Sequence, residues 1–475
     1  MSKKGWILTI LTMILLLTMA LAGCGGGSKQ EASKEQKPAE QAASGGKFDW
    51  KMASGATINV MLNKHPYADA IIKRLPEFEQ KTGIKVNYSV TPEENYFDKL
   101  TTALNAKNGN PDVFMTGSYQ MWEYATAGYM EALDNYIKDP GKTSPDYDIN
   151  DFYEGILAGD RWDLKPGHPA GTGSQWAIPL AFETNTLMYN KKAFEKAGIK
   201  EPPKTFDELV DVAKKLNGWN GPGSYGIAVR GTRSWATIHP GYMTAFYLDG
   251  AKDFALENGK LVCKLDSPEA IDVTKKFTDL IKAAGPKDWT NYTWYQVGAD
   301  LGAGKAAMIY DADILGFFQN VPGASAESGN IAWAPGPKMK DGVPPGANEW
   351  IWSIAMNSSS KNKQAAWIFM QFFTSKEHDL WGATQAEVVD PARKSVWADQ
   401  KFIDRMKTQT GYIETFKTII DNTSIKFTPQ PEFFNTTTEW AATLQKIVTQ
   451  NADVQASMKE LTAKVNDMVS RIRIE

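Results

Sequence analysis

The sequence has few cysteines and a net charge close to zero, and each of these features excludes some classes of protein. Among 475 residues there are two cysteines, Cys24 and Cys263, and the formal net charge is −3. A surface that binds nucleic acid is usually clearly basic, so nucleic acid is not an expected partner. No long apolar run occurs after the first 24 residues. The rest of the chain is therefore not expected to span a membrane.

The chain also lacks the spacings that catalytic and metal sites require. Its histidines, at 65, 168, 239 and 378, are isolated, and no His-Glu-x-x-His occurs. Neither a metal nor another cofactor is expected. A Gly-x-Ser-x-Gly nucleophile elbow is missing too. Asp311 and Asp313 could suggest the two carboxylates of a glycosidase, but residues two apart on an extended segment point in opposite directions. We therefore predict that the protein is not an enzyme.

The start of the chain has the features of a secretory signal. Two lysines precede an apolar run at residues 6–21, which is shorter than the ~20 residues of a membrane-spanning helix. Residues 21–24 read Leu-Ala-Gly-Cys, which resembles a bacterial lipobox. That resemblance implies a lipoprotein signal peptide at 1–23 and palmitate on Cys24. The protein would then be anchored by lipid to the extracytoplasmic face of the cell membrane.

A polar segment separates the lipobox from the body. Residues 25–47 contain no large apolar side chain before Phe48, so we expect a flexible linker that, with lipidated Cys24, spans 24–55. If Cys24 carries lipid, Cys263 has no partner and no intramolecular disulfide forms. The roughly 425 residues that remain are too many for one ordinary core and predict two lobes.

The early body alternates strand and helix. Strands are expected at 57–62, 84–90 and 112–115, with a helix between each pair. This order predicts a mostly parallel sheet with helices on its faces, and ligands bind such sheets at the carboxyl ends of the strands. Site candidates therefore follow the first and third strands: Asn63, Lys64, His65, Tyr119 and Gln120.

The second half of the body shows further regular elements. Thr205 and Glu208 have the spacing of a capping box, which predicts a helix start. Helices are also expected at 269–284 and 363–373, and a buried strand at 306–310.

Several stretches of the body resemble one protein family. In this order and spacing they are similar to the family 1 extracellular solute-binding proteins of ABC importers, whose best-known member is maltose-binding protein. The stretches are 78–86 (FEQKTGIKV), 110–114 (NPDVF), 124–128 (YATAG), 178–183 (IPLAFE), 189–194 (YNKKAF), 201–209 (EPPKTFDEL) and 304–308 (GKAAM).

The resemblance implies a fold and its division. The fold class would be α/β, of the periplasmic-binding-protein-like type II fold, in which two α/β lobes close on a ligand in the cleft between them. The implied limits are 56–177 plus 338–373 for lobe 1, 178–331 plus 380–475 for lobe 2, and hinge crossings near 177–179 and 332–337.

Aromatic content points to the kind of ligand. The chain has 16 tryptophans, and aromatic rings stack on the flat C–H faces of sugars while polar groups bind the hydroxyls. Trp235 lies in a Gly/Arg/Ser-rich loop and Trp350 follows a Pro/Gly-rich loop, so both are ligand candidates, whereas Trp367 is expected in the core. The resemblance adds Glu183, His239, Tyr242, Asp311, Asp313 and Arg393; the last could equally pair with an acid.

These observations together predict a function. We expect a monomeric substrate-binding lipoprotein that captures a carbohydrate, in the first instance an oligosaccharide, and delivers it to the transmembrane subunits of an ABC permease. Tyr119 and Gln120 stand where maltose-binding protein has an Asp-Arg pair, so maltose specificity is not supported. Two alternatives stay open: a receptor for a non-sugar solute, such as a phosphorylated polyol, polyamine or metal chelate, and a cell-attached carbohydrate-active enzyme.

Overall fold

The computed structural model describes residues 47–474. These residues belong to one compact unit. The predicted signal peptide, the lipidated Cys24 and most of the predicted linker lie outside the described residues. Within 47–474, no helix combines the length and apolar character that a membrane crossing needs.

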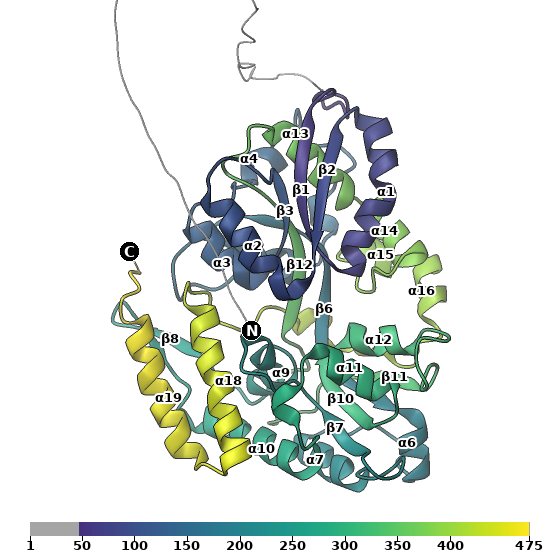
Figure 1. Ribbon diagram of the computed structural model, residues 1–475, viewed down its shortest axis with the longest axis vertical. Coiled ribbons are helices and arrows are strands. Elements are labelled where there is room, and N and C mark those ends of the chain that lie inside the picture. The colour runs from purple at the N-terminus through teal and green to yellow at the C-terminus, as the bar shows by residue number, and fades with distance from the viewer. Residues whose placement is uncertain (1–46, 475) are drawn as a thin grey trace, which may run out of the picture. The chain divides into compact units, whose positions relative to one another are not determined.

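An eight-stranded mixed sheet runs through the unit and is bordered by helices (Figure 1), and two further sheets, β4-β5 and β8-β9, have two strands each. Its strand order is β2-β1-β3-β12-β6-β10-β7, and β11 also pairs with β6. The strands are β1 (Thr57–Asn63), β2 (Lys85–Thr91), β3 (Val113–Gly117), β6 (Ala177–Asn190), β7 (Tyr225–Ala228), β10 (Ala306–Ala312), β11 (Ile331–Ala334) and β12 (Glu349–Met356).

The sheet is less parallel than the sequence pattern predicts. β1 pairs in parallel with β2 and β3, and β10 pairs in parallel with β7. However, β12 is antiparallel to β3 and β6, and β6 is antiparallel to β10 and β11. The alternating pattern covers only the first part of the chain. β12 reaches β3 from far along the sequence, so no local crossover forces it to be parallel.

Two long-range strands join the two ends of the sheet. β6 pairs with β12 over most of its first half, and with β10 and β11 over its second half. The β6–β12 register shifts between Trp352 and Ser353, opposite Pro179. Proline has no N–H to donate, so a bulge at this point is the expected local solution.

Helices cover the end of the sheet that holds β1 to β3, which is the first lobe. α1 (Pro66–Thr82) ends at Gly83, which has a φ of 71° and accepts the left-handed conformation without a Cβ clash. The ring of Phe78 lies 5.3 Å from that of Phe369 on α13 (Lys363–Phe373). Trp367 is fully buried on the same helix and belongs to the core, as predicted.

The other end of the sheet, with β7, β10 and β11, forms the second lobe. α7 (Phe206–Lys215) begins with the predicted capping box of Thr205 and Glu208. α10 (Pro268–Ala284) and β10 match the predicted helix and strand. The neighbouring helices are α6 (Lys191–Lys196), α8 (Trp235–Ile238), α9 (Gly241–Leu248), α11 (Trp294–Gly302) and α12 (Asp313–Asn320).

The C-terminal region contributes to both ends. α14 (Lys376–Gln385) packs on α13, and Arg74 of α1 pairs with its Glu377. α18 (Phe433–Gln450) packs on α8 and α10, and α19 (Val454–Val469) packs on α18.

The limits of the two lobes stay a prediction. The remaining elements are α2 (Glu93–Asn105), α3 (Ser118–Thr126), α4 (Asp134–Ile137), α5 (Glu154–Gly159), α15 (Lys394–Trp397), α16 (Gln400–Met406), α17 (Tyr412–Ile419), β4 (Arg161–Trp162), β5 (Ser174–Gln175), β8 (Phe254–Glu257) and β9 (Lys260–Cys263).

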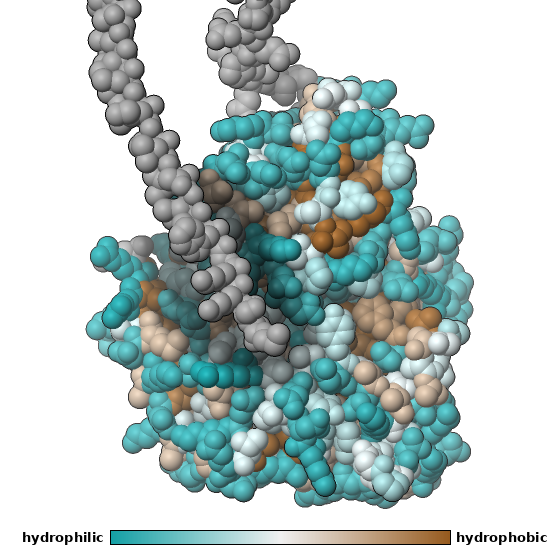
Figure 2. Space-filling view, in the orientation of Figure 1, coloured by the Kyte–Doolittle hydropathy of each residue, from teal (hydrophilic) through white to brown (hydrophobic). Residues whose placement is uncertain are grey.

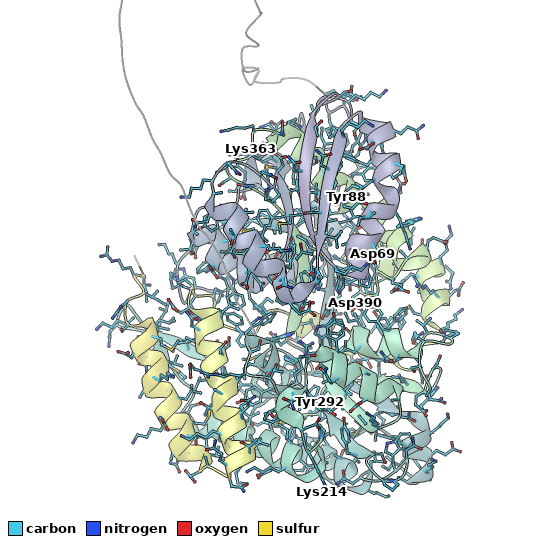
Figure 3. The ribbon with its side chains drawn as sticks, in the orientation of Figure 1. Asp69, Tyr88, Lys214, Tyr292, Lys363 and Asp390 are labelled. Carbon is cyan, nitrogen blue, oxygen red and sulfur yellow. The ribbon has the colours of Figure 1, made fainter. Side chains whose placement is uncertain are left out.

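The surface and the middle of the unit differ in character. Hydrophilic side chains dominate the face in Figure 2, with a hydrophobic patch near the edge strand β2, whose Val90 is exposed. Asp390 lies between the two ends of the sheet (Figure 3), and its carbonyl accepts a hydrogen bond from the Phe182 N–H on β6. Cys263 is buried and free.

Candidate ligand-binding site

A pocket lies between the two ends of the sheet and takes side chains from both. The space open to the centre of a water molecule is about 70 Å³. This cleft, as we call it below, is lined by residues from strand ends and helix starts. They are Lys64, His65, Pro66, Glu93, Glu183, Arg230, Trp235, Ala236, His239, Trp294, Ile314, Leu315, Phe318, Trp350 and Trp352.

The carboxyl ends of the parallel strands supply much of the polar lining. Lys64 and His65 follow β1, Glu93 follows β2, and Arg230 comes two residues after β7. These ends meet at one edge of each parallel group, which is where doubly wound sheets bind ligands. Lys64 directs its ammonium to the Asp69 carboxylate, with a 2.7 Å contact.

His65 is a neutral donor at the edge of the cleft. Its Nδ1 accepts a hydrogen bond of 3.3 Å from the Tyr67 N–H at the start of α1. The ring proton therefore sits on Nε2, which lies 3.8 Å from Glu183 Oε1. Burial lowers the pKa of His65 to about 3, so the contact with Glu183 joins neutral imidazole to the carboxyl group.

Glu183 is the buried acid of the cleft. It lies on β6, and its Oε1 accepts a hydrogen bond of 3.1 Å from the indole N–H of Trp352 on the neighbouring β12. Burial raises the pKa of Glu183 to about 8, although Arg230 acts in the opposite direction. The carboxyl group is therefore neutral at pH 7, and it can both donate and accept hydrogen bonds.

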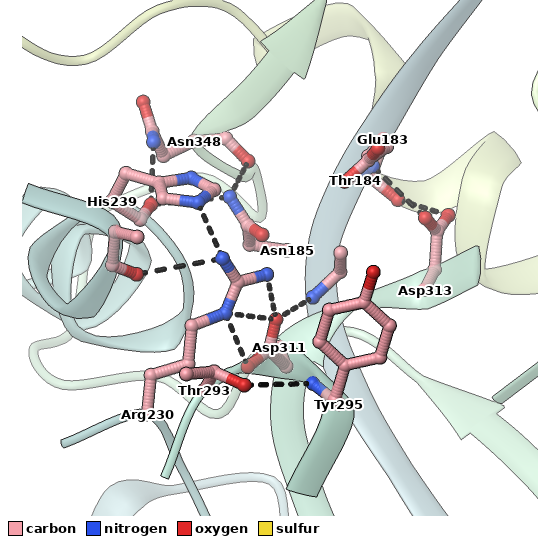
Figure 4. Close-up of polar contacts among 12 residues, drawn as sticks. Glu183, Thr184, Asn185, Arg230, His239, Thr293, Tyr295, Asp311, Asp313 and Asn348 are labelled. Carbon is pink, nitrogen blue, oxygen red and sulfur yellow. Dashed lines mark hydrogen bonds and ion pairs between the residues drawn. The ribbon is translucent and has the colours of Figure 1, made fainter. Parts of the chain in front are cut away.

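Arg230 is held by three partners (Figure 4). Its Nε lies 3.0 Å from Asp311 Oδ2 and its Nη2 lies 2.6 Å from Asp311 Oδ1. Its Nη1 donates to His239 Nε2 at 3.0 Å and more weakly to the Ala236 carbonyl. Burial and the positive charge of Arg230 lower the pKa of His239, so this ring is neutral. A guanidinium has five N–H donors, and these contacts leave one on Nη2 without a partner among residues 47–474.

Aromatic rings form the walls of the cleft. Trp350 and Trp352 project from the same face of β12 with ring centroids 5.1 Å apart. Trp235 of α8 lies 5.1 Å from Trp350 at an interplanar angle of 31°. Gly117 at the end of β3 makes room for this arrangement, because a Cβ there would lie 2.2 Å from the Trp350 ring.

The charges in the cleft nearly balance. Arg230 is matched by Asp311, Glu183 is neutral at pH 7, and both histidines are uncharged. Burial also raises the pKa of Glu93. A cleft with neutral donors, neutral acceptors and aromatic walls suits an uncharged solute rich in hydroxyl groups.

The structure brings six of the predicted site residues into the cleft lining and places the other seven elsewhere. Those in the lining are Lys64, His65, Glu183, Trp235, His239 and Trp350. Asp311 lies directly behind the lining, where it holds Arg230. Asn63, Tyr119, Gln120, Tyr242, Asp313 and Arg393 are buried and do not line the cleft. The contacts of the six with a ligand stay a prediction.

Tyr242 and Arg393 are two of the buried candidates that have clear structural partners. Tyr242 shares a hydrogen bond with Thr274 of α10 at 2.7 Å. The Arg393 guanidinium donates hydrogen bonds to the backbone carbonyls of Thr374 and Asp148, and so it joins segments of the first lobe. Its Nη1 also lies 3.6 Å from the Asp151 carboxylate, which is the pairing with an acid that the sequence left open for Arg393.

Five polar or aromatic residues of the cleft do not follow from the sequence analysis: Glu93, Arg230, Trp294, Phe318 and Trp352. Arg230 and Glu93 follow strands, so the rule that selected Asn63 and Lys64 applies to them as well. Trp352 shares a strand face with Trp350, and period-two spacing would identify it once β12 is predicted. Trp294, at the start of α11, has no such signal.

The sequence is similar to those of known binding proteins. The sequence profile of the bacterial extracellular solute-binding protein family matches residues 62–379. The erythritol/L-threitol-binding protein of Mycolicibacterium smegmatis is 42% identical over 446 residues, which cover 94% of this chain and 91% of that protein. The chain therefore belongs to the bacterial extracellular solute-binding protein family.

Solved structures support the same fold. An ABC transporter solute-binding protein of Agrobacterium radiobacter K84, in complex with ribitol, matches with a TM-score of 0.73 and 23% identity, over 88% of this chain and 99% of that chain. A maltose-bound protein of T. maritima matches with a TM-score of 0.73 and 22% identity, over 87% and 100%. The predicted type II periplasmic-binding-protein fold is confirmed. The family and these neighbours are binding proteins, and the family acts outside the cytoplasm.

Proposed function

We propose that this chain is the receptor of an ABC importer for a small uncharged polyol, with a four-carbon alditol such as erythritol as the first candidate. The observation that carries the proposal is the neutral, aromatic cleft around Glu183 and Arg230. The relative that is 42% identical over nearly the whole chain is an erythritol/L-threitol-binding protein. A linear alditol offers hydroxyl groups to the polar side chains and C–H groups to the tryptophan walls.

The size of the cleft favours a small alditol over the oligosaccharide expected from the sequence. About 70 Å³ is open to the centre of a water molecule, whereas one water needs about 10–15 Å³ by the same measure. The cleft therefore has room for roughly five water-sized groups, which suits a short polyol or a single small sugar.

Capture and delivery follow from the two-lobed fold. A solute that touches both lobes binds the closed state better and shifts the population towards it. The closed form is then recognised by the permease, and the chain performs no covalent chemistry on the solute. We also propose the lipid anchor on Cys24 after removal of residues 1–23, a monomeric state, and the lobe limits given by the resemblance. Anchoring would keep the receptor at a high local concentration near its permease.

Glu183 variants test the proposal at its central side chain. Glu183→Ala is expected to weaken erythritol binding by about tenfold or more, because it removes a buried hydrogen-bonding group. Glu183→Gln is expected to retain affinity within about threefold at pH 7, because its amide reproduces the neutral carboxyl group and still accepts from the Trp352 indole. Isothermal titration calorimetry with erythritol measures both.

A second buried acid provides the matched control. Glu349 lies on β12, is fully buried and does not line the cleft, so Glu349→Gln should leave erythritol affinity unchanged. If Glu183→Ala bound erythritol as tightly as the wild type, Glu183 would not belong to the site.

A further inference from the structure

A cluster of three aromatic side chains lies behind the Trp235 and Trp350 wall of the cleft. Tyr119 of α3 is fully buried, and its ring lies 5.2 Å from Trp350 and 5.9 Å from Trp235. On its other side the ring lies 4.6 Å from Phe433 and 5.3 Å from Phe427. Phe427 and Phe433 in turn lie 5.0 Å apart. We call Tyr119, Phe427 and Phe433 the aromatic plug.

Hydrogen bonds fasten the plug to segments that are distant in the sequence. The Tyr119 hydroxyl donates to the Glu349 carbonyl at 2.8 Å. The Asn348 amide donates to the Tyr119 hydroxyl at 3.0 Å and to the His239 carbonyl. The Asn348 side-chain oxygen accepts from the Lys426 N–H at 2.8 Å. One buried amide therefore joins the first lobe, the second lobe and the C-terminal segment that carries the plug phenylalanines.

A larger cavity lies beyond the plug. It has about 380 Å³ open to the centre of a water molecule, compared with about 70 Å³ in the cleft. Phe427 lines this second cavity, so the plug touches the linings of both spaces. Small residues such as Gly155, Ala158 and Gly159 form part of the wall, and Lys252 and Thr428 supply polar groups.

We propose that the aromatic plug sets the upper size of the solute by separating the cleft from this second cavity. The proposal rests on the proposed function and deepens it, because it explains which part of the chain excludes longer solutes. Removal of a plug ring joins the two spaces and leaves room for one sugar ring beyond an alditol.

Maltitol is the probe that matches this geometry. It carries a linear alditol end, which fits the cleft, and a glucosyl ring, which needs the space behind the plug. Phe433→Ala is the test variant, because its ring touches both other plug residues and lines neither pocket. Phe402→Ala is the matched control: Phe402 is fully buried on α16 and packs on Trp397, away from the cleft.

Calorimetric titration of the full chain with erythritol and with maltitol tests the plug. The wild type and Phe402→Ala should bind erythritol and show no maltitol binding. Phe433→Ala should bind maltitol, with an affinity at least about tenfold above the detection limit that bounds the wild type. If Phe433→Ala does not fold, Phe433→Leu, which keeps an apolar side chain but shortens it, is measured in the same way.

The outcomes separate the plug from the proposed function. A wild type that binds maltitol overturns the plug, and so does a folded plug variant that binds no maltitol, whatever its affinity for erythritol. A wild type that binds no alditol contradicts the proposed function instead. A gain of maltitol binding that also occurs in Phe402→Ala would reflect general loosening and would overturn the plug as well.

Discussion

Arg230→Met is expected to abolish measurable erythritol binding and to destabilise the protein by about 3–5 kcal/mol. Arg230 and Asp311 form an ion pair in which the side chains are only 7% and 0% exposed. Removal of the guanidinium leaves the Asp311 carboxylate buried without its cation, and desolvation of that charge is not compensated. The cleft also loses the fixed donor on Nη2 that we assign to a ligand hydroxyl.

A double variant separates these two losses. In Arg230→Met/Asp311→Asn the buried charge is gone, so most of the lost stability should return while erythritol binding stays absent. Chemical denaturation measures the free energy of unfolding, and calorimetry measures binding. If Arg230→Met retained wild-type affinity, Arg230 would only serve the fold. If the double variant regained erythritol binding, the loss of binding in Arg230→Met would be caused by the unpaired Asp311 carboxylate and not by the absence of the arginine.

Glu349→Gln is expected to flatten the pH dependence of stability. Glu349 is fully buried, and neither carboxyl oxygen has a hydrogen-bond partner among the described residues. Burial raises its pKa from an ordinary 4.5 to about 8, although Lys426 acts in the opposite direction. The folded state therefore keeps a proton between pH 4.5 and 8 that the unfolded state releases.

The sign and size of the effect follow from proton linkage. Because the folded pKa exceeds the unfolded one, stability falls as pH rises through this window, by about 1.4 kcal/mol per pH unit. Glutamine does not titrate, so Glu349→Gln should exceed the wild type in stability by about 4 kcal/mol more at pH 8 than at pH 5. Lys426, whose pKa burial lowers to about 8, contributes only above that window. Denaturant titrations across pH 5–8 check this, and parallel curves for the two proteins would contradict it.

Much of the fold follows from local patterns in the sequence. The alternation of apolar residues predicts β1 to β3, and Thr205 with Glu208 predicts the start of α7, because these signals act over a few residues. The antiparallel pairing of β12 with β3 and β6 does not follow, because it joins segments more than 160 residues apart in sequence. No local periodicity encodes such a pairing.

The site is predicted best where it uses strand ends. Lys64 and His65 line the cleft because they follow β1. Tyr119 follows β3 by the same rule, but its ring belongs to the aromatic plug. The two phenylalanines of the plug, Phe427 and Phe433, come from the C-terminal region, whose position does not follow from the sequence. Arg230 follows β7 by the same rule, but its contacts with Asp311 and His239 depend on the folded chain and do not follow from the sequence.

A calorimetric titration of the wild-type full chain with a panel of solutes tests the central claim most directly. The panel holds erythritol, ribitol, mannitol, maltose and maltotriose. The cleft predicts saturable one-to-one binding of erythritol, with a dissociation constant of about 10 µM or tighter, and no binding of maltotriose. Saturable binding of maltose or maltotriose, with no heat from any of the three alditols, would contradict it.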